Sequence, residues 1–371
     1  MTIPPIIWPT ALGLVAAIQL FYYLYFFARL ATYKLPKRTA SQEHAVSVVI
    51  CARDEAPNLV KNLPGILVQE YPTTHEVIVV NDNSTDESKF ILERFQKTFK
   101  NLNVIPLKQE AKGIPGKKFP LSVGIKSAKH EIVLLTDADC IPASEHWIKK
   151  MQDTYVNGVE VVLGYGAYKK YPGLLNKMIR FETFHTALQY FSYALAGKPY
   201  MGVGRNLSYR KDTFVRNKGF SAINQIPSGD DDLFINMVAN KENTAIVVDK
   251  DAHTLSDPHT SWKSWMRQKA RHYTTAKYYK ESHKFLLTLY ALVHTLVYPL
   301  TVVTALFYSW QIAVGIFGFR LLIEAIVWYK SMKKLNETDL FPMFLLFDLW
   351  MFIYNILFFP SLRRKPSRRW E

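Results

Sequence analysis

Uncharged, apolar stretches near both ends of the chain constrain its fold most strongly. Residues 6–27 contain no charged side chain, and residues 285–319 form a second uncharged block, interrupted only by His294. A helix rises about 1.5 Å per residue and the hydrocarbon core of a bilayer is about 30 Å thick, so the first block predicts one membrane-spanning helix. The second block is too long for one crossing. We expect it to divide near Trp310 into one span and the start of another that ends near Tyr329.

A further apolar block, residues 340–360, carries Asp348 and Asn355. A full crossing by this block would take the C-terminus to the side opposite the central region, yet the tail contains five cations, which favour the cytoplasmic side. Two alternatives follow: this segment is re-entrant or interfacial, or the number of spans differs from four. In the preceding span, Arg320 and Glu324 are four residues apart and are expected to form a structural ion pair, with a functional polar site as the alternative.

The distribution of charge argues against the partner that the overall charge first suggests. The chain has 371 residues and a net charge of +15, a balance typical of nucleic-acid-binding proteins. Much of this excess borders the apolar blocks, because Arg29, Lys34, Lys37 and Arg38 follow the first block and the tail is basic. Such flanks indicate membrane topology and contact with anionic lipid, so we expect membrane lipids and no nucleic acid as partners. With the uncharged N-terminal tail outside, the central region is expected in the cytoplasm.

These patterns divide the chain into three regions. We expect a transmembrane anchor with its basic flank in residues 1–38, a cytoplasmic domain in residues 39–284, and transmembrane or interfacial helices with a basic tail in residues 285–371. A hydrophobic content of 49% excludes a disordered chain. Only Cys51 and Cys140 are present, which excludes a scaffold built on disulfides.

The central region alternates short β-branched runs with helical stretches, which is typical of an α/β fold with a mostly parallel, Rossmann-like sheet. Helices are expected over residues 86–99 and 120–129. Ligands of such sheets bind beyond the carboxyl ends of the strands. Five runs are predicted to be buried strands: residues 46–51, 77–80, 103–107, 131–136 and 159–164.

Charged side chains gather at these strand ends. Arg53 and Glu55 follow the first predicted strand, NDNSTD at residues 81–86 follows the second, and Asp137 and Asp139 follow the fourth. Two carboxylates that alternate on an extended chain can hold a hard divalent cation, and such a cation can neutralise a diphosphate. The chain has no Walker loop and no GxGxxG after a strand, so ATPase and dinucleotide-binding functions lack their phosphate-binding element.

Seven segments between residues 46 and 273 resemble, in order, the conserved blocks of the membrane-bound family 2 glycosyltransferases. The resemblance implies a nucleotide-sugar-binding GT-A fold. The last segment is similar to QxxRW, which is typical of the branch that includes hyaluronan, chitin and cellulose synthases and ceramide glucosyltransferase. The segments are VSVVICARDEAPNL, VIVVNDNSTDES, GKKFPLSVGIKSA, VLLTDADC, GVGRNLSYRKDTF, SGDDDLF and QKARHY.

The resemblance implies an inverting transfer of a sugar from a nucleotide-sugar donor, expected to be a UDP-sugar, to a hydroxyl of a lipid or glycan. Asp139, with Asp137, is implied to hold Mg²⁺ or Mn²⁺. Asp231 matches the general base of the family. Because three consecutive acids repel one another, one of them is expected to have a raised pKa. The implied nucleotide-sugar pocket consists of Arg53, Glu55, Asp82, Lys117 and Asp137.

The last segment implies further catalytic residues. On a helix, Gln268, Arg271 and His272 share one face, while Trp262 and Trp265 lie roughly opposite, so this helix is expected in the membrane interface. The resemblance implies that Arg271, a permanent cation, reaches the diphosphate, and Gln268 is assigned to catalysis with it. The family usually has Trp where His272 stands. The residues assigned to the acceptor side or to other roles in the site are Asp230, His272 and Asn206.

The acceptor remains open between several alternatives. Apolar residues at helical spacing over residues 173–196 predict an interfacial or core helix, with acceptor contact as the alternative. A processive polysaccharide synthase needs a channel, and the apolar blocks are few for one, which favours transfer to a lipid or lipid-linked glycan. An inactive membrane scaffold with the same fold is the alternative of another class. The presence of Asp139, Asp231 and Arg271 argues against it.

Overall fold

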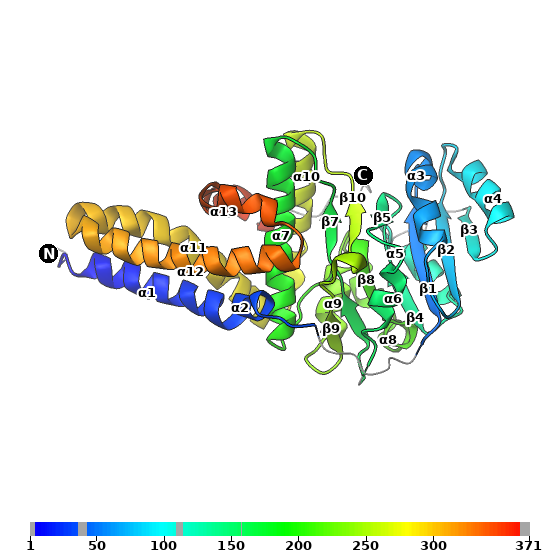
Figure 1. Ribbon diagram of the computed structural model, residues 1–371, viewed down its shortest axis with the longest axis horizontal. Coiled ribbons are helices and arrows are strands. Elements are labelled where there is room, and N and C mark those ends of the chain that lie inside the picture. The colour runs from blue at the N-terminus through cyan, green and yellow to red at the C-terminus, as the bar shows by residue number, and fades with distance from the viewer. Residues whose placement is uncertain (1–3, 36–42, 109–113, 157, 364–371) are drawn as a thin grey trace.

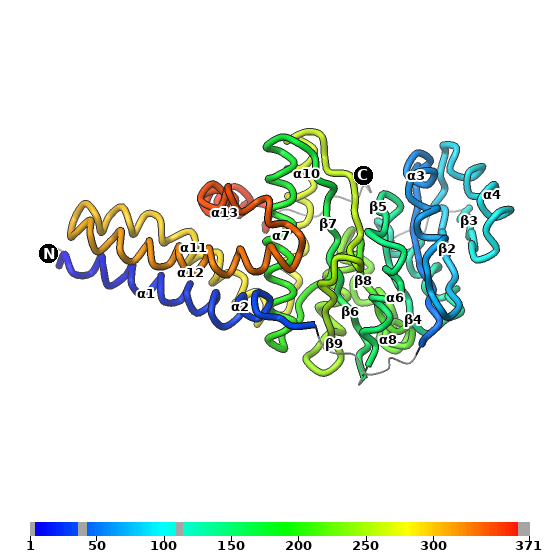
Figure 2. Tube along the Cα trace, viewed as in Figure 1, coloured from blue at the N-terminus to red at the C-terminus, as the bar shows by residue number. Residues whose placement is uncertain are grey.

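The computed structural model describes residues 4–35, 43–108, 114–156 and 158–363. Lys37, Arg38 and the tail cations beyond residue 363 lie outside the described residues, as does the expected boundary between residues 38 and 39. Figure 1 shows an elongated molecule in which long helices form one end and an α/β unit forms the other. Figure 2 shows that the N-terminus lies at the end of the long helices farthest from the α/β unit. After the α/β unit, the chain returns to these helices.

A large, mostly parallel sheet is the frame of the α/β unit. Its strands are β1 (Val46–Ala52), β2 (His75–Asp82), β3 (Leu102–Leu107), β4 (Ile132–Leu135), β6 (Val161–Leu163), β8 (Leu207–Arg210) and β9 (Thr244–Ile246). They lie in the order β3-β2-β1-β4-β8-β6-β9. All neighbours are parallel except β8, which runs antiparallel between β4 and β6. The five predicted strands and the mostly parallel sheet are confirmed.

The first strand after β4 belongs to a second, three-stranded sheet. β5 (Cys140–Pro142) pairs antiparallel with β10 (Thr254–Ser256), which pairs in parallel with β7 (Gly166–Tyr168). Because β5 begins directly after Asp139, this small sheet holds the segment between Leu135 and Cys140 at the carboxyl end of the large sheet. The predicted acidic pair therefore lies at the junction of the two sheets.

Helices cover the large sheet as local sequence predicts. The expected helices over residues 86–99 and 120–129 are present as α4 and α5. In α3, Pro57 lies in the first turn, where a missing N–H costs little, and Leu59, Leu63 and Ile66 form one buried face. The helices of the α/β unit are α3 (Ala56–Leu67), α4 (Ser88–Thr98), α5 (Lys118–Ser127), α6 (Trp147–Gln152), α7 (Leu174–Leu195), α8 (Lys211–Arg216), α9 (Asp232–Val238) and α10 (Trp262–Tyr273).

Four helical segments are long and apolar enough to cross a membrane: Ile7–Ala31, Glu281–Phe307, Trp310–Lys334 and Thr338–Leu362. They contain α1 (Ile7–Phe21), α2 (Ala28–Ala31), α11 (Glu281–Phe307), α12 (Trp310–Lys334) and α13 (Phe344–Phe358). In Figure 1, α1, α11 and α12 lie lengthwise beside one another, whereas α13 is strongly foreshortened and crosses them next to α7 and α10. Whether residues 340–360 lie along the interface or cross the membrane stays a prediction. The expected division near Trp310 is confirmed.

Helices α7 and α10 join the α/β unit to the long helices. The predicted helix over residues 173–196 is present as α7. Its buried residues lie on all sides, so of the two alternatives, an interfacial helix and a core helix, α7 is a core helix. Phe181 of α7 stacks on Phe347 of α13 at 4.2 Å between ring centroids. In α10, Trp262 is partly exposed, but Trp265 is buried against Trp350 of α13. Because α13 covers this side of α10, Trp265 packs inside the protein, and the location of α10 in the membrane interface stays a prediction.

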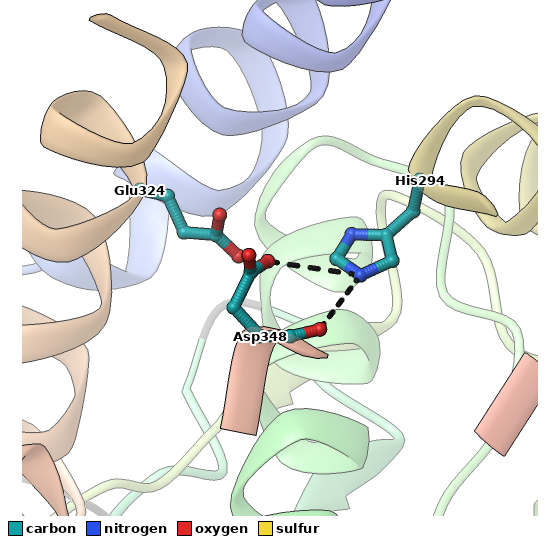
Figure 3. Close-up of side chains that lie close together, drawn as sticks. All are labelled: His294, Glu324 and Asp348. Carbon is teal, nitrogen blue, oxygen red and sulfur yellow. Dashed lines mark hydrogen bonds and ion pairs between the residues drawn. The ribbon is translucent and has the colours of Figure 1, made fainter. Parts of the chain in front are cut away.

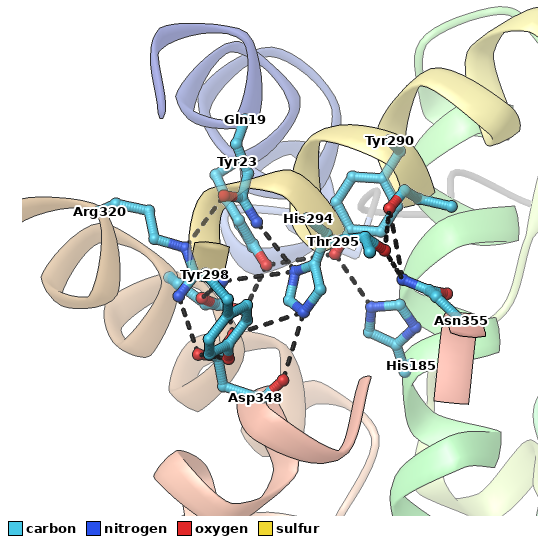
Figure 4. A network of polar contacts seen from close by, with 12 residues as sticks. Gln19, Tyr23, His185, Tyr290, His294, Thr295, Tyr298, Arg320, Asp348 and Asn355 are labelled. Carbon is cyan, nitrogen blue, oxygen red and sulfur yellow. Dashed lines mark hydrogen bonds and ion pairs between the residues drawn. The ribbon is translucent and has the colours of Figure 1, made fainter. Parts of the chain in front are cut away.

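A buried polar network ties α13 to the long helices. The Arg320 guanidinium lies 2.9 Å from the Glu324 carboxylate, which confirms the expected ion pair, and 2.5 Å from Asp348 of α13. Gln19 of α1 accepts a hydrogen bond from Arg320 and contacts His294 of α11 (Figure 4). The network therefore joins all four long segments in a region where a lone charge would be costly.

Part of this network has the ligand types of a metal site. His294, Glu324 and Asp348 each bring one ligand atom to within 4.8 Å of the others (Figure 3). The Arg320 guanidinium, however, contacts both carboxylates. Since this permanent cation already pairs with both acids, the cluster is an ion-pair network and gives no support to a metal there.

Candidate active site

One cavity of about 1020 Å³ begins at the carboxyl ends of β1 and β4 and continues to α11 and α13. Parallel strands bring their carboxyl ends to one edge, so residues far apart in the chain meet there. Arg53, Asp82 and Asn206 are not among the residues that line this cavity. The sequence-predicted site residues that do line it are Glu55, Lys117, Asp137, Asp139, Asp230, Asp231, Gln268, Arg271 and His272.

Lys117 is the cation at the centre of the acidic cluster. It lies at the start of α5, and its Nζ is 2.9 Å from the Asp137 carboxylate and 3.3 Å from that of Asp230. Gly116 before it has a φ of +76°, and a Cβ there would lie 2.2 Å from the Pro227 carbonyl oxygen, so only glycine allows this approach. Burial alone would raise the pKa of Asp137, but the charge and hydrogen bond of Lys117 hold that pKa below its ordinary value.

Asp139 differs from Asp137 because no cation pairs with it in the described part of the chain. Burial, followed by the negative charge of Asp137, raises the pKa of Asp139 above its ordinary value. Burial also raises the pKa of Glu55, and the charges of Asp139 and Asp137 add to the effect. An excess of negative charge from carboxylates in a partly buried cavity is the donor set that suits Mg²⁺ or Mn²⁺. Asp139 and Asp137 therefore fit the expected metal.

The three consecutive acids of the GDDD segment have three different environments. Asp230 pairs with Lys117 at 3.3 Å, and Asp232 accepts hydrogen bonds from the hydroxyls of Thr275 at 2.5 Å and Tyr279 at 2.7 Å. Asp231 caps α9 and accepts a hydrogen bond from the backbone N–H of Gly204 at 2.8 Å.

These environments single out Asp231 as the acid suited to proton transfer. Burial, followed by the charges of Asp230 and Asp232, raises the pKa of Asp231 to about 7. A carboxylate with this pKa can take up a proton near neutral pH. Asp230 is held by a cation. Burial raises the pKa of Asp232 as well, but the hydroxyls of Thr275 and Tyr279 already bind its carboxylate, so the expectation of a raised pKa in the three acids fits Asp231 as the acid open to a substrate proton.

Helix α10 forms the wall opposite the acids. Gln268, Arg271 and His272 all line the cavity, as their helical spacing predicts. The charge of Arg271 helps to lower the pKa of Asp137, which places this guanidinium near the acidic strand end. The side-chain carbonyl oxygen of Gln268 is buried and has no hydrogen-bond partner among the described residues. It is therefore available to a bound ligand.

Arg53 and Asp82 lie beside the cavity and not on its wall. Their side chains form an ion pair of 3.8 Å across the ends of β1 and β2. Between them, the Asp54 carboxylate accepts a hydrogen bond of 2.7 Å from the backbone N–H of Thr85, which fastens the two strand-end loops together. This arrangement leaves the assignment of Arg53 and Asp82 to the nucleotide pocket a prediction.

Asn206, expected on the acceptor side, occupies the core. Its side chain is fully buried and accepts a hydrogen bond from the Trp147 indole at 3.0 Å. Its amide donates to the carbonyl oxygens of Tyr165 at 3.0 Å and Ala252 at 2.7 Å. Every strong hydrogen-bonding group of Asn206 is thus used inside the protein. The expectation of acceptor contact is wrong, and Asn206 instead joins the two sheets.

Arg205, the residue before it, is a site residue to which sequence reasoning gave no role. Its guanidinium lines the cavity, lies 4.2 Å from the ring centroid of Tyr168 and donates a hydrogen bond of 2.6 Å to the Ser256 hydroxyl. The charges of Asp139 and Asp137 raise its pKa further, against the effect of burial. The signal was present, because Arg205 stands within the segment GVGRNLSYRKDTF that resembles a conserved block.

Comparisons with known protein families agree with this geometry. The family described as glycosyl transferase family 2 matches residues 47–214. The family described as glycosyl transferase family group 2 matches residues 132–362, which is more than half of the chain and includes α10 to α13. The two matches together cover both the acidic strand ends and the helices that close the cavity.

Curated relatives match about a third of this chain. Glycosyltransferase AglE from Haloferax volcanii is 31% identical over 121 residues, which are 32% of this chain and 38% of the relative. Beta-monoglucosyldiacylglycerol synthase from Nostoc sp. is 31% identical over 120 residues, which are 31% of this chain and 25% of the relative. The matches thus span well under half the length of these relatives.

A solved structure resembles the fold over nearly its whole length. The mannosyltransferase PcManGT from Pyrobaculum calidifontis, in complex with GDP-Man and Mn²⁺, superposes with a TM-score of 0.55 and 18% identity. The superposition covers 91% of this chain and 99% of that chain. The expected GT-A fold is thereby confirmed.

Proposed function

Since the chain belongs to the family 2 glycosyltransferases, we propose that it transfers a sugar from a nucleotide-sugar donor, a UDP-sugar, to a hydroxyl group of a membrane lipid or lipid-linked glycan with inversion of configuration. The observation that carries the proposal is the position of Asp231, whose pKa is about 7, in the same cavity as Asp137, Asp139 and Arg271. A base, a cation site and a permanent cation are the parts that such a transfer requires.

The donor diphosphate binds at the end of the cavity that the acidic strand end and the cations share. Asp139 and Asp137 would hold Mg²⁺ or Mn²⁺, which would supply positive charge to neutralise the diphosphate. Arg271 and Arg205 lie on the cavity wall and stabilise the charge that develops on the departing diphosphate. The Mn²⁺ and GDP-Man of the P. calidifontis enzyme support this placement by analogy of fold.

The acceptor hydroxyl approaches from the side of α9. Asp231 accepts its proton while the hydroxyl oxygen forms a bond to the anomeric carbon of the donor sugar. The bond from that carbon to the diphosphate oxygen breaks, and its electron pair leaves with the nucleoside diphosphate. A single displacement inverts the configuration at the anomeric carbon. The N–H of Gly204 and that of Asp232 hold the Asp231 carboxylate in place for this step.

The four apolar segments support an integral membrane location. We place α1, α11 and α12 across the bilayer, with α13 along the interface and the α/β unit in the cytoplasm. Three crossings return the chain to the side of the α/β unit after α12, which agrees with the cations of the tail on the cytoplasmic side.

The test uses full-length protein in detergent, a panel of UDP- and GDP-sugars with added Mg²⁺ or Mn²⁺, and detection of the released nucleotide. The Asp231→Asn variant should bind the donor but transfer sugar about 10²- to 10⁴-fold more slowly, because it cannot accept the proton. Asp212→Asn, at an exposed carboxylate of α8, is the matched control and should retain wild-type activity.

Full transfer activity of Asp231→Asn, with donor and metal bound, would remove Asp231 as the base. Wild-type protein that binds no donor and releases no nucleotide with any sugar of the panel would instead support the inactive scaffold. A long polymer as the product would support the processive synthase.

A further inference from the structure

The cavity does not end at the acids and cations of the transfer site. Beyond Tyr273 it continues between α11 and α13, where Thr288, Leu292 and Thr295 form one face of α11 and Asn355 and Ile356 face them from α13. The character of the wall changes along this path. It is charged at the strand ends and becomes mainly apolar between the two helices.

The apolar end of the cavity opens sideways. Leu292, Ile356 and Phe359 line the cavity, and yet 51%, 54% and 58% of their surfaces are exposed. A residue can satisfy both conditions only where the wall of the cavity passes onto the outside of the molecule. That outside belongs to segments long and apolar enough to lie in a membrane, so the opening faces the lipid of the bilayer.

Uncharged hydrogen-bonding groups of α7 and α10 lie between the apolar end and the acids. The Thr183 hydroxyl lines the cavity in a side chain that is only 8% exposed, and it has no hydrogen-bond partner among the described residues. The side-chain carbonyl oxygen of Gln268 is also buried and also has no hydrogen-bond partner among the described residues. A buried polar group without a partner is costly, so both point to a ligand that supplies hydrogen bonds at this level.

Two of the cations at this level, Lys269 and Lys284, are already paired with carboxylates. Lys269 forms an ion pair with Glu182, and both side chains are buried. Lys284, nearer the opening, pairs with Glu281 at 2.5 Å. A phosphate headgroup would compete with the Glu182 carboxylate for the buried Lys269, whereas an uncharged headgroup with hydroxyls would not.

The wall that α13 contributes is held firmly. Asp348 of α13 is fixed by Arg320, and Asn355 places its amide 3.5 Å from both the Ala291 carbonyl oxygen and the Thr295 hydroxyl of α11 (Figure 4). These contacts set the distance between the two helices at the base of the opening, so the space between them is a built feature of the fold.

From these observations we infer that the acceptor is an uncharged, hydroxyl-bearing lipid that enters from the bilayer between α11 and α13. Its hydrocarbon chain lies against Leu292 and Ile356, and its headgroup bonds to Thr183 and Gln268 with one hydroxyl directed at Asp231. This inference rests on the proposed glycosyl transfer and narrows its acceptor to one class of lipid.

The test blocks the opening without touching the donor side. Leu292→Trp and Ile356→Trp fill the space between the helices, and their matched controls are Leu306→Trp on α11 and Leu345→Trp on α13, which are exposed and do not line the cavity. Phosphatidylcholine vesicles carry either dioleoylglycerol or decaprenyl phosphate as acceptor. Transfer to the lipid and hydrolysis of the donor by water are measured separately.

We expect the wild-type protein to transfer the sugar to dioleoylglycerol. In Leu292→Trp and Ile356→Trp, the KM for dioleoylglycerol should rise about tenfold, which corresponds to lost contact with roughly two methylene groups. The control variants and the hydrolysis rate should stay at wild-type values. Unchanged transfer in the two blocking variants would overturn the route between the helices. Transfer to decaprenyl phosphate alone, or to a soluble oligosaccharide with no effect of blocking, would overturn the uncharged lipid.

A second measurement does not depend on activity. A diacylglycerol with a diazirine in its acyl chain should label α11 and α13 in the wild type, and unlabelled dioleoylglycerol should compete with that labelling. Labelling without competition would overturn the inference even if the protein proved inactive. Competition in a protein that releases no nucleotide would support the lipid site while removing the proposed transfer.

Discussion

The raised pKa of Asp231 predicts how a single substitution changes the pH dependence of the reaction. Asp231 acts as a base only when ionised, so kcat should rise with pH through a midpoint near its pKa of about 7. Replacement of Asp230 by Asn removes a negative charge that helps to raise that pKa. The midpoint should therefore move to lower pH.

The size of the shift follows from Coulomb's law. A neighbouring unit charge at about 6 Å in an effective dielectric of about 20 contributes roughly 2–3 kcal/mol, or about two pKa units. Asp230 is paired with Lys117 at 3.3 Å, which screens part of its charge. In Asp230→Asn the same Lys117 remains beside Asp231 and lowers the pKa further. We therefore expect the acidic limb of the profile to move down by about 1–2 pH units.

The assay is the rate of nucleotide release between pH 5 and pH 9 with saturating donor and acceptor, so that kcat reports the bound complex. Asp212→Asn, at an exposed carboxylate of α8, is the control and should leave the profile unchanged. If the limb of Asp230→Asn stays in place while donor binding is intact, or moves to higher pH, then Asp231 is not the group that titrates.

Two further predictions concern residues that only the structure singles out. Arg205→Lys loses the planar contact with Tyr168 and should lower kcat by about 10²-fold with little change in the affinity for acceptor, as steady-state kinetics would show; an unchanged kcat would remove Arg205 from the stabilisation of the diphosphate. Asp348→Asn leaves the buried Arg320 with one carboxylate fewer and should lower the free energy of unfolding by about 3 kcal/mol. Denaturant titration in detergent measures this change, with Asp212→Asn as the control. Equal stability of the two variants would contradict a structural role for the network.

Much of the fold was predictable because its signals are local. Each of the five predicted strands is present, since a run of β-branched residues can be recognised without knowledge of its neighbours, but β3 at the edge of the sheet is only partly buried. The short strand β8 was not predicted. Its antiparallel place between β4 and β6 depends on pairing with residues far away in the chain, including the hydrogen bond from the Ser208 hydroxyl to the Val133 carbonyl oxygen.

The sequence predicted which types of residue form the candidate site, but it predicted the roles of the individual residues less well. The acids at 137, 139 and 230–232 were identified from their segments, and all of them line the cavity, where the hydroxyls of Thr275 and Tyr279 bind Asp232. Asn206 belongs to a segment of the same kind but is buried between the sheets. The difference lies in which side chains happen to face each residue, and that information is not local.

The sequence by itself determined that the chain has apolar blocks of membrane-spanning length, an α/β region between them, and a series of glycosyltransferase segments in order, because hydrophobicity, periodicity and motif order can be read along the chain. Only the tertiary structure decided that Asp231 is the acid with a pKa of about 7, where Arg205 points, and that α13 crosses the other long helices and leaves an opening beside α11. A pKa depends on burial and on neighbouring charges, and an opening depends on the distance between helices. Both arise when residues distant in sequence are brought together.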